Sequence, residues 1–573
     1  MTRIFDDPAR FAEDQLEGFL DLYADRLRGV PGGVVAHRTA QPQVAVVIGG
    51  GSGHYPAFCG TVGPGFATGA VVGNIFTSPS ASQAASVGRA ADQGRGVIFS
   101  FGNYAGDVIN FGLAADRMRD EGIDTRILLV TDDIASSPDI AQRRGIAGDF
   151  TVFKVLGAAA AEGHDIDVVE TFGRQANDHT RTLGVAFSGC TMPGADEPLF
   201  TVPQGQLGLG LGIHGEPGIR DMATLPATDL GRMLVDDLLA DAPDTSSRRV
   251  AVILNGLGTT KYEELFLLWR IVAARLREAG LTIVAPEVGE LVTSLDMGGC
   301  SLTLMWLNDD LERLWCADAY TPGYRKTAAP LLPLVKPSAA ERQLVPPVLA
   351  VPSASANSVA LAATVRAVLK VARDTIAEHE HELGRIDAVA GDGDHGRGMR
   401  KGVEAALARA EGTGQDAGAG WVLRQAGQAW ADEAGGTSGV LWGAALESVG
   451  RDLDDYGAAF GPDDLARAVR EFTATIHKLG KAKLGDKTMV DALVPFGTEL
   501  ESALNTGVAA AKAWSVAAAV ATMAAAETAE LTPRIGRARP LAEKSVGTPD
   551  AGATSFALLC TAIGAHLTSE RTA

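Results

Sequence analysis

The sequence predicts an α/β two-lobed domain followed by an all-α domain, and two observations carry that prediction. In roughly the first 330 of 573 residues, short apolar runs rich in β-branched residues alternate with longer helical patterns. Beyond a segment rich in proline, alanine and serine, long alanine-rich helical patterns are interrupted by glycine-rich loops. The first rhythm is typical of α/β proteins, and the second of all-α domains.

The strands expected in the first domain are short apolar runs. They lie at residues 44–48, 96–100, 126–131, 184–188, 250–255, 281–286 and 302–306. Two of these runs, 44–48 and 250–255, lead into glycine-rich turns, which favours two stacked α/β lobes.

The domain boundaries follow from the change in composition. Residues 1–330 form the predicted α/β domain, residues 331–357 the linker, and residues 358–573 the helical domain. Within the last, 358–383 and 514–531 carry the longest helical patterns.

Composition and charge exclude several classes of partner. Fifty Lys and Arg against seventy Asp and Glu give a net charge of −20, which disfavours binding to phosphate backbones or anionic lipid. The N-terminal segment has no apolar signal-peptide core, and no run approaches the length of a membrane span. Five scattered cysteines without a C-x-x-C pair suggest neither a disulfide framework nor a zinc site. We expect a cytoplasmic protein with neither nucleic acid nor membrane as a partner.

Two motifs in the first domain follow predicted strands. The segment "VAVVIGGGSGHYPAFCG" (44–60) predicts either a backbone cradle for phosphate or a small ligand, or simply a tight turn. It is not a P-loop, and the G-x-G-x-x-G pattern fails at His54. In "FGNYAGDVINFGLA" (101–114), Asp107 lies in a glycine-flanked turn at a strand end, where open α/β sheets bind ligands; the alternative is a helix N-cap.

A third motif surrounds one histidine with glycines. In "GLGLGIHGEPG" (208–218), His214 stands where almost no neighbouring side chain can block its ring. An accessible neutral imidazole can act as a base, a metal ligand or a nucleophile near pH 7. Metal ligation is disfavoured because no second His or Cys lies at ligand spacing. Proton transfer and covalent attachment remain.

The helical domain carries a cluster of aspartates. "RIDAVAGDGDHGRGM" (385–399) places Asp387, Asp392 and Asp394 within eight residues, with glycines that break the helix between them. Three converging carboxylates favour a hard cation, usually Mg²⁺ together with substrate phosphates. The residue pattern excludes an EF-hand, because Val403 occupies the position of its final glutamate.

Further loops fit a Mg-nucleotide site on a helical scaffold. "AGGTSGVLWG" (434–443) presents Gly435, Gly436, Thr437 and Ser438 at the start of a predicted helix, suited to phosphate. "GKAKLGDKTMVDAL" (480–493) and "GRARPLAEKSVGTPDAGATS" (536–555) add basic residues and a Thr-Pro-Asp-Ala-Gly turn.

Together these motifs resemble the single-chain, ATP-dependent form of the dihydroxyacetone kinase family. "GGGSGH", "GNYAGD", "GIHGEPG", "GDGDHG", "GGTSG", "GDKTM" and "PDAGA" occur in family order and span both domains. The resemblance implies a two-lobed α/β substrate domain and a helical barrel that binds the nucleotide. It also implies a homodimer, often with the nucleotide domain of one chain serving the substrate domain of the other.

The resemblance implies roles for the first-domain residues. His214 would form a covalent hemiaminal with the carbonyl carbon of a short ketose, which selects ketoses over polyols. His54 would hydrogen-bond the bound ketose, and Asp107 would accept the proton of the hydroxyl that attacks the γ-phosphate. Backbone contacts would come from Gly51, Ser52 and Gly53.

For the second domain the resemblance implies ATP as co-substrate and two Mg²⁺ ions. The metal ligands would be Asp387, Asp392 and Asp394. The nucleotide contacts would be His395, Gly396, Arg397, Gly398, Gly436, Thr437, Gly480, Met489, Arg537, Asp550, Ala551 and Gly552.

Two departures from the family pattern bear on the substrate. Many relatives have lysine where this chain has Gly102, and glutamate where it has Tyr55. Loss of the lysine opens volume and removes a donor beside the ketose, so we expect a four-carbon ketose such as erythrulose. The alternatives are dihydroxyacetone as the substrate, a non-catalytic sugar-binding regulator, and an FAD-splitting cyclase.

Overall fold

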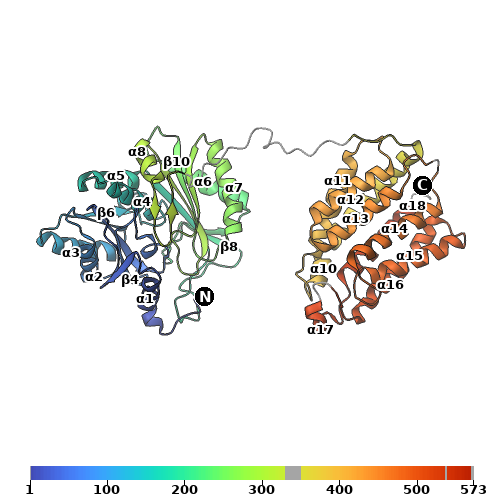
Figure 1. Cartoon of the computed structure of the whole chain (residues 1–573), viewed down its shortest axis with the longest axis horizontal. Helices are drawn as coiled ribbons and strands as arrows, with labels where there is room; N and C mark the ends of the chain where they lie inside the picture. Colours follow the sequence, from blue (N-terminus) through green and yellow to red (C-terminus); the bar gives the residue numbers. More distant parts are fainter. Residues whose placement is uncertain (1, 330–349, 458, 536–538, 570–573) are drawn as a thin grey trace. The chain divides into compact units, whose positions relative to one another are not determined.

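The computed structural model describes residues 2–329, 350–457, 459–535 and 539–569. These residues form two compact units, Met1–Lys336 and Pro337–Ala573, coloured blue to green and yellow to red in Figure 1. Most of the predicted linker, residues 331–349, lies outside the described residues. The predicted fold class is confirmed, because an α/β unit precedes a helical one.

The first sheet of the α/β unit holds the strands that lead into the candidate motifs. Its order is β1 (Leu27–Val30), β2 (Gly33–Ala36), β4 (Gly69–Ile75), β3 (Ala45–Ser52), β5 (Val97–Gly102) and β6 (Thr125–Val130). Strand β3 runs parallel to β4 and β5, and β5 runs parallel to β6. The carboxyl ends of β3 and β5 therefore meet at one edge, which is the usual ligand edge of such sheets.

The second sheet is mostly antiparallel. Its order is β11 (Thr282–Gly289), β10 (Arg249–Gly256), β12 (Gly298–Trp306), β7 (Thr180–Ser188), β8 (Gln206–Leu209) and β9 (Arg220–Ala223). Strands β13 (Ala319–Tyr320) and β14 (Arg325–Lys326) form a separate hairpin. Each predicted strand overlaps an observed one, and the two sheets account for the two expected lobes.

One helix lies between the sheets. α4 (Gly148–Ala161) is buried over all but its last residue, and it packs against β3 of the first sheet and β7 of the second. Such all-round burial requires an apolar helix, and its alanine, valine and phenylalanine side chains meet that requirement. Its first turn faces the candidate site, as described below.

The remaining helical segments of the unit cover the sheets and connect their strands (Figure 1). They are η1 (Pro8–Arg10), α1 (Phe11–Leu22), η2 (Cys59–Thr61), α2 (Ala81–Ala91), α3 (Ala105–Asp120), η3 (Ile140–Gln142), α5 (Ile166–Asp178), α6 (Ala227–Ala240), α7 (Tyr262–Glu278) and α8 (Asp309–Cys316).

The second unit contains only helices among its described elements. They are α10 (Ala356–Asp387), α11 (His395–Gly412), α12 (Ala419–Ala434), α13 (Gly436–Asp452), α14 (Pro462–Gly480), α15 (Val490–Asn505), α16 (Ala510–Glu527), η4 (Thr528–Glu530), η5 (Arg539–Leu541), α17 (Ala542–Ser545) and α18 (Ala551–Ser569). Small residues let the helices approach closely: a Cβ on Gly427 of α12 would lie 2.5 Å from the carbonyl oxygen of Gly443 on α13.

The last helix of the unit, α18, is strongly apolar. By length and composition α18 is apolar enough to cross a membrane. It instead packs against α10, α15 and α16, and Phe556, Leu559 and Cys560 are buried in the helical core. A core helix of a bundle has the same composition as a membrane span, so composition alone does not separate the two.

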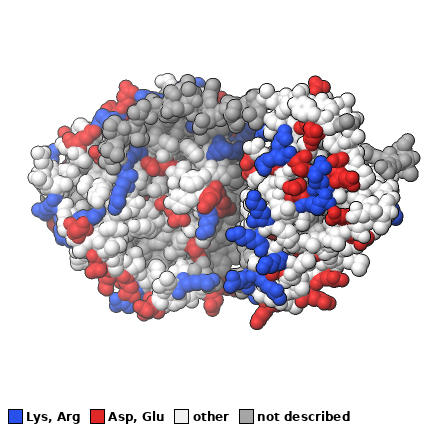
Figure 2. Space-filling model, turned by 45° about the vertical axis from the view of Figure 1, so that its right-hand side comes forward, with Lys and Arg blue, Asp and Glu red and all other residues white. Residues whose placement is uncertain are grey.

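The surface carries charges of both signs. Figure 2 shows acidic and basic side chains interspersed over the visible face. All five cysteines are free thiols, and four of them are buried.

Candidate active site

A cavity of about 260 Å³ lies at the carboxyl ends of β3 and β5. Its walls bring together residues from six segments of the chain, and they include Gly51, His54, Asp107, Asp149, His214 and Glu216. Three of the expected substrate-site side chains, those of His54, Asp107 and His214, therefore share one cavity. Ser52 and Gly53 are not part of its wall.

The ring of His214 is held by Glu216. Its Nδ1 lies 2.8 Å from Glu216 Oε1, and the His214 backbone N–H donates to Glu216 Oε2 at 3.0 Å. Burial alone would raise the pKa of Glu216, but the hydrogen bond and charge of His214 outweigh it and bring that pKa to about 2. Glu216 is thus an ionised acceptor that fixes the proton on Nδ1 and turns Nε2 into the cavity.

His54 faces His214 across the cavity. It is 3% exposed, its Nδ1 donates to the carbonyl oxygen of Thr293 at 2.7 Å, and its Nε2 lies 3.1 Å from Nε2 of His214. Burial, helped by the neighbouring His214, lowers the pKa of His54 to about 3, so its ring stays neutral. With the proton on Nδ1, Nε2 of His54 can only accept a hydrogen bond.

Asp107 lies in the first turn of α3, whose N-cap is Tyr104. The glycine-flanked turn and the N-cap alternative expected from the sequence are therefore both wrong. Its Oδ1 accepts from Ser78 Oγ at 2.7 Å, and Asn110 Nδ2 donates to the same hydroxyl at 3.3 Å. Burial raises the pKa of Asp107, and the bond from Ser78 partly opposes that shift. The arrangement suits a partly buried base held in one orientation.

The glycines of this site are needed for close backbone approach. A Cβ on Gly51 would lie 2.6 Å from the backbone nitrogen of Thr77, so no larger residue fits there. Gly53 has a φ of +104°, a conformation that side chains disfavour.

The helical unit contains a second cavity, of about 310 Å³. It lies where α10 ends and where α11, α13, α15 and α18 begin. Helix N-termini present free backbone N–H groups, which suit phosphate. The wall includes most of the expected nucleotide residues: His395, Gly398, Gly436, Thr437, Gly480, Met489, Asp550, Ala551 and Gly552.

Three expected nucleotide residues are not part of this wall. Gly396 is buried against α10, where a Cβ would lie 2.0 Å from the carbonyl oxygen of Glu380, so its glycine serves helix packing. Arg397 is exposed. Arg537 lies outside the described residues.

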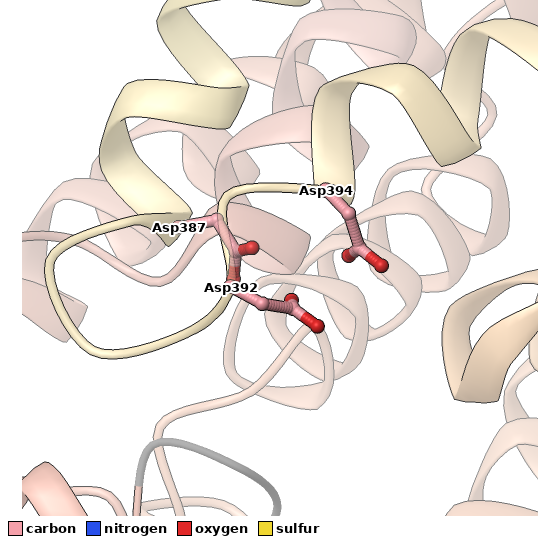
Figure 3. A group of neighbouring side chains, drawn as sticks. All are labelled: Asp387, Asp392 and Asp394. Carbon is pink, nitrogen blue, oxygen red and sulfur yellow. The ribbon is translucent and has the colours of Figure 1, made fainter. Parts of the chain in front are cut away.

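The three aspartates converge at one end of this cavity. Asp387 ends α10, Asp392 lies in the connecting loop and Asp394 is the N-cap of α11 (Figure 3). A carboxylate oxygen from each lies within 4.8 Å of the others. Oδ2 of Asp387 is buried with no hydrogen-bond partner among the described residues. Clustered carboxylates with an unsatisfied buried oxygen fit a hard divalent cation.

Sequence reasoning missed Glu216, Ser78 and Lys487 as functional candidates. Lys487 borders the second cavity, is 5% exposed, and its Nζ donates to the carbonyl oxygens of Leu531 and Ser545 at 3.1 and 2.7 Å. Burial lowers its pKa. The segments "GIHGEPG" and "GDKTM" contain Glu216 and Lys487, but the sequence does not show that either side chain forms a functional contact.

Both units match known protein domains. Residues 17–323 match the Dak1 domain, and residues 389–565 match the DAK2 domain. The chain is 57% identical to the D-erythrulose kinase of Mycolicibacterium smegmatis, with 97% of each chain covered. It is 52% identical to the L-erythrulose kinase of Pectobacterium atrosepticum, covering 100% of this chain and 98% of that one.

A solved structure with both domains is also similar. The dihydroxyacetone kinase from C. freundii in complex with AMP-PNP and Mg²⁺ matches with a TM-score of 0.58, at 29% identity and 99% coverage of both chains.

Proposed function

The chain belongs to the dihydroxyacetone kinase family, with a Dak1 and a DAK2 domain in one polypeptide, and we propose that it phosphorylates erythrulose with ATP. It is an ATP-dependent ketose kinase. The observation that carries the substrate-site assignment is the convergence of His214, His54 and Asp107 in one cavity, each held by a different neighbour.

His214 is the residue that holds the ketose. The lone pair on Nε2 bonds to the carbonyl carbon, and the carbonyl π electrons move to the oxygen. Net transfer of the Nδ1 proton to the new alkoxide leaves a neutral hemiaminal, and Glu216 stays ionised. Polyols have no carbonyl and cannot be held in this way. His54 Nε2, which can only accept, receives a hydrogen bond from a hydroxyl of the ketose.

Asp107 is the base for phosphoryl transfer. Its carboxylate takes the proton of the acceptor hydroxyl as that oxygen bonds to the γ-phosphorus and the bond to ADP breaks. Ser78 donates to Oδ1, which leaves Oδ2 for the substrate. Burial raises the pKa of Asp107 and thereby makes it a stronger base than an exposed aspartate.

The helical unit holds the nucleotide. Asp387, Asp392 and Asp394 would ligate two Mg²⁺ ions, and the N-termini of α11, α13 and α18 would bind phosphates through backbone N–H groups. Bound Mg²⁺ would neutralise charge on the phosphate oxygens. Lys487, fixed by two backbone carbonyls, adds a donor at the same wall.

Three observations support a four-carbon substrate. Relatives at 57% and 52% identity carry the names D- and L-erythrulose kinase. The cavity volume of about 260 Å³ leaves room for a chain longer than dihydroxyacetone. Gly102 lies on its wall without a side chain. Because these relatives differ in the enantiomer they are named for, the proposal covers erythrulose without assigning its hand. We also propose that the protein is a cytoplasmic homodimer.

Substrate comparison tests this proposal. ADP release is measured with Mg-ATP and dihydroxyacetone, D-glyceraldehyde, D-erythrulose, L-erythrulose or glycerol. We expect the highest kcat/KM with one erythrulose enantiomer and no turnover of glycerol. A kcat/KM for dihydroxyacetone equal to or above that for both enantiomers would identify the protein as a triose kinase instead. Light scattering measures the molar mass and so tests the proposed dimer.

A further inference from the structure

One buried carboxyl in the ketose cavity takes no part in ketose attachment or phosphoryl transfer. Asp149 lies in the first turn of α4, is 4% exposed and borders the cavity. Its Oδ1 is buried and has no hydrogen-bond partner within the described part of the chain. An unsatisfied buried carboxyl is costly, so a native protein retains one where a ligand completes it.

A second unsatisfied group lies on the same wall. The hydroxyl of Tyr104 is buried without a partner in the described structure, and Tyr104 also borders the cavity. Its ring meets His214 edge-on, with centroids 5.2 Å apart. Burial, then the charges of Glu216 and other carboxylates including Asp149, raise the pKa of Tyr104, so the phenol keeps its proton and can donate.

Two glycines keep the space beside Asp149 free of other side chains. A Cβ on Gly145 would lie 2.4 Å from Cα of Gly102 and 2.9 Å from Oδ1 of Asp149. A Cβ on Gly102 would in turn lie 2.9 Å from the carbonyl oxygen of Gly145. The two backbones therefore pack directly on one another, and the polar atoms of this wall come from Asp149 and Tyr104.

A neighbouring aspartate shows what a structural carboxyl looks like here. Asp132 is fully buried, but its two oxygens accept from the backbone N–H groups of Ile146 and Gly148 at 2.9 and 2.7 Å. It fixes the loop that enters α4. Asp149, one residue beyond Gly148, forms no such bond and faces the cavity instead.

We propose that Asp149 and Tyr104 form a specificity subsite that hydrogen-bonds the extra hydroxyl distinguishing a four-carbon ketose from dihydroxyacetone. This inference rests on the proposed function. Burial, followed by the nearby carboxylates of Asp132 and Asp107, raises the pKa of Asp149 well above its usual range and favours its protonated form. A protonated carboxyl both donates and accepts, as does a phenol, and a sugar hydroxyl can satisfy both. Dihydroxyacetone, one hydroxymethine shorter, leaves them unsatisfied.

The test compares erythrulose with dihydroxyacetone in the full chain at saturating Mg-ATP. The variants are Asp149→Leu, which removes both polar atoms at similar volume, Asp149→Asn, which retains a donor and an acceptor, and Tyr104→Phe. For Asp149→Leu and Tyr104→Phe we expect the ratio of kcat/KM for erythrulose to that for dihydroxyacetone to fall about 10- to 100-fold. The fall is carried by KM, because the subsite lies away from the transferred phosphoryl group. Asp149→Asn retains most of the ratio.

The matched control is Asp132→Asn. It weakens the loop entering α4 and lowers the melting temperature, and we expect the substrate ratio to stay unchanged. If Asp149→Leu does not fold, Tyr104→Phe decides, because it removes only one hydroxyl. A ratio unchanged in the folded variants overturns the subsite while the proposed function stands. Wild-type protein without any preference for erythrulose overturns the proposed substrate and the subsite together.

Discussion

The two cavities hold their functional groups by different physical means. In the ketose cavity His54 and Asp107 are buried and His214 is half-buried, and each is held by one neighbour: Glu216 for His214, Thr293 for His54 and Ser78 for Asp107. In the nucleotide cavity the groups are loop glycines, helix N-termini and aspartates, two of which are exposed. Hydrogen-bond donors and acceptors held in fixed orientations suit a small uncharged ketose, whereas clustered carboxylates and helix N-termini suit a cation and phosphates.

Substrate choice and metal dependence therefore rest on different interactions. Burial lowers the pKa of His54 to about 3 and keeps its ring neutral beside the ketose, while in the nucleotide cavity burial raises the pKa of Asp550 to about 7. Binding in the nucleotide cavity depends on charge, because the carboxylates of Asp387, Asp392 and Asp394 need a cation to offset their mutual repulsion. Substitutions in the first cavity should therefore change rates and substrate choice, and those in the second should change metal and nucleotide dependence.

Removal of the base in the ketose cavity should have the largest effect. Asp107→Asn keeps the acceptor for Ser78 but cannot take a proton, so we expect kcat to fall about 10³-fold. Steady-state ADP release measures this, with melting temperature as the folding control. A kcat close to that of the wild type would show that another group is the base.

A substitution in the aspartate cluster should change the Mg²⁺ dependence of the reaction. For Asp392→Asn we expect the Mg²⁺ concentration at half-maximal rate to rise roughly 10- to 100-fold, with the KM for ketose unchanged. Titration with MgCl₂ at fixed ATP measures this shift. Glu404→Gln on the outer part of α11 is the control, and an equal shift there would speak against a metal role for the cluster.

Loss of the carboxylate behind His214 should give an intermediate effect. Glu216→Gln retains a hydrogen bond but removes the charge that holds the imidazole proton, so kcat/KM for erythrulose should fall about 10- to 100-fold. Activity with Mg-ATP checks this, and nucleotide binding by the helical unit should be unaffected. Unchanged kcat/KM would mean that His214 does not depend on Glu216.

The smallest effect concerns stability. Asp149→Asn replaces an unsatisfied buried carboxyl with a neutral amide, so we expect a rise of about 2 °C in melting temperature at neutral pH. Because the pKa of Asp149 is raised in the folded state, the folded wild type holds this proton more strongly than the unfolded chain does. The wild type therefore loses stability as the pH rises from the unfolded pKa of about 4 toward the folded value. The gain of Asp149→Asn should therefore grow with pH. Calorimetry from pH 4 to 8 checks it, and a constant gain would contradict the raised pKa.

Much of the fold was predictable because its signals are local. Apolar runs flanked by glycine predict strands, and alanine-rich periodic segments predict helices, so the α/β unit and the helical unit follow from the letters. The motif residues were predictable in the same way, since loops that bind phosphate or expose an imidazole need glycine. Strands β1, β2, β8 and β9 were missed because each is only four residues long, too short to show a clear apolar pattern.

The residue types, their order and the chemistry that each can perform follow from the sequence alone. The sequence identified His214, Asp107 and the aspartates 387, 392 and 394 because their surroundings are unusual within a few residues. Tertiary contacts determine that Glu216 holds the His214 ring and that His54 stays neutral. They also determine that Asp149 borders the cavity with an unsatisfied oxygen, whereas Asp132 is hydrogen-bonded to the backbone. These properties depend on burial and on partners as many as 239 positions apart, and desolvation and hydrogen bonding act through space rather than along the chain.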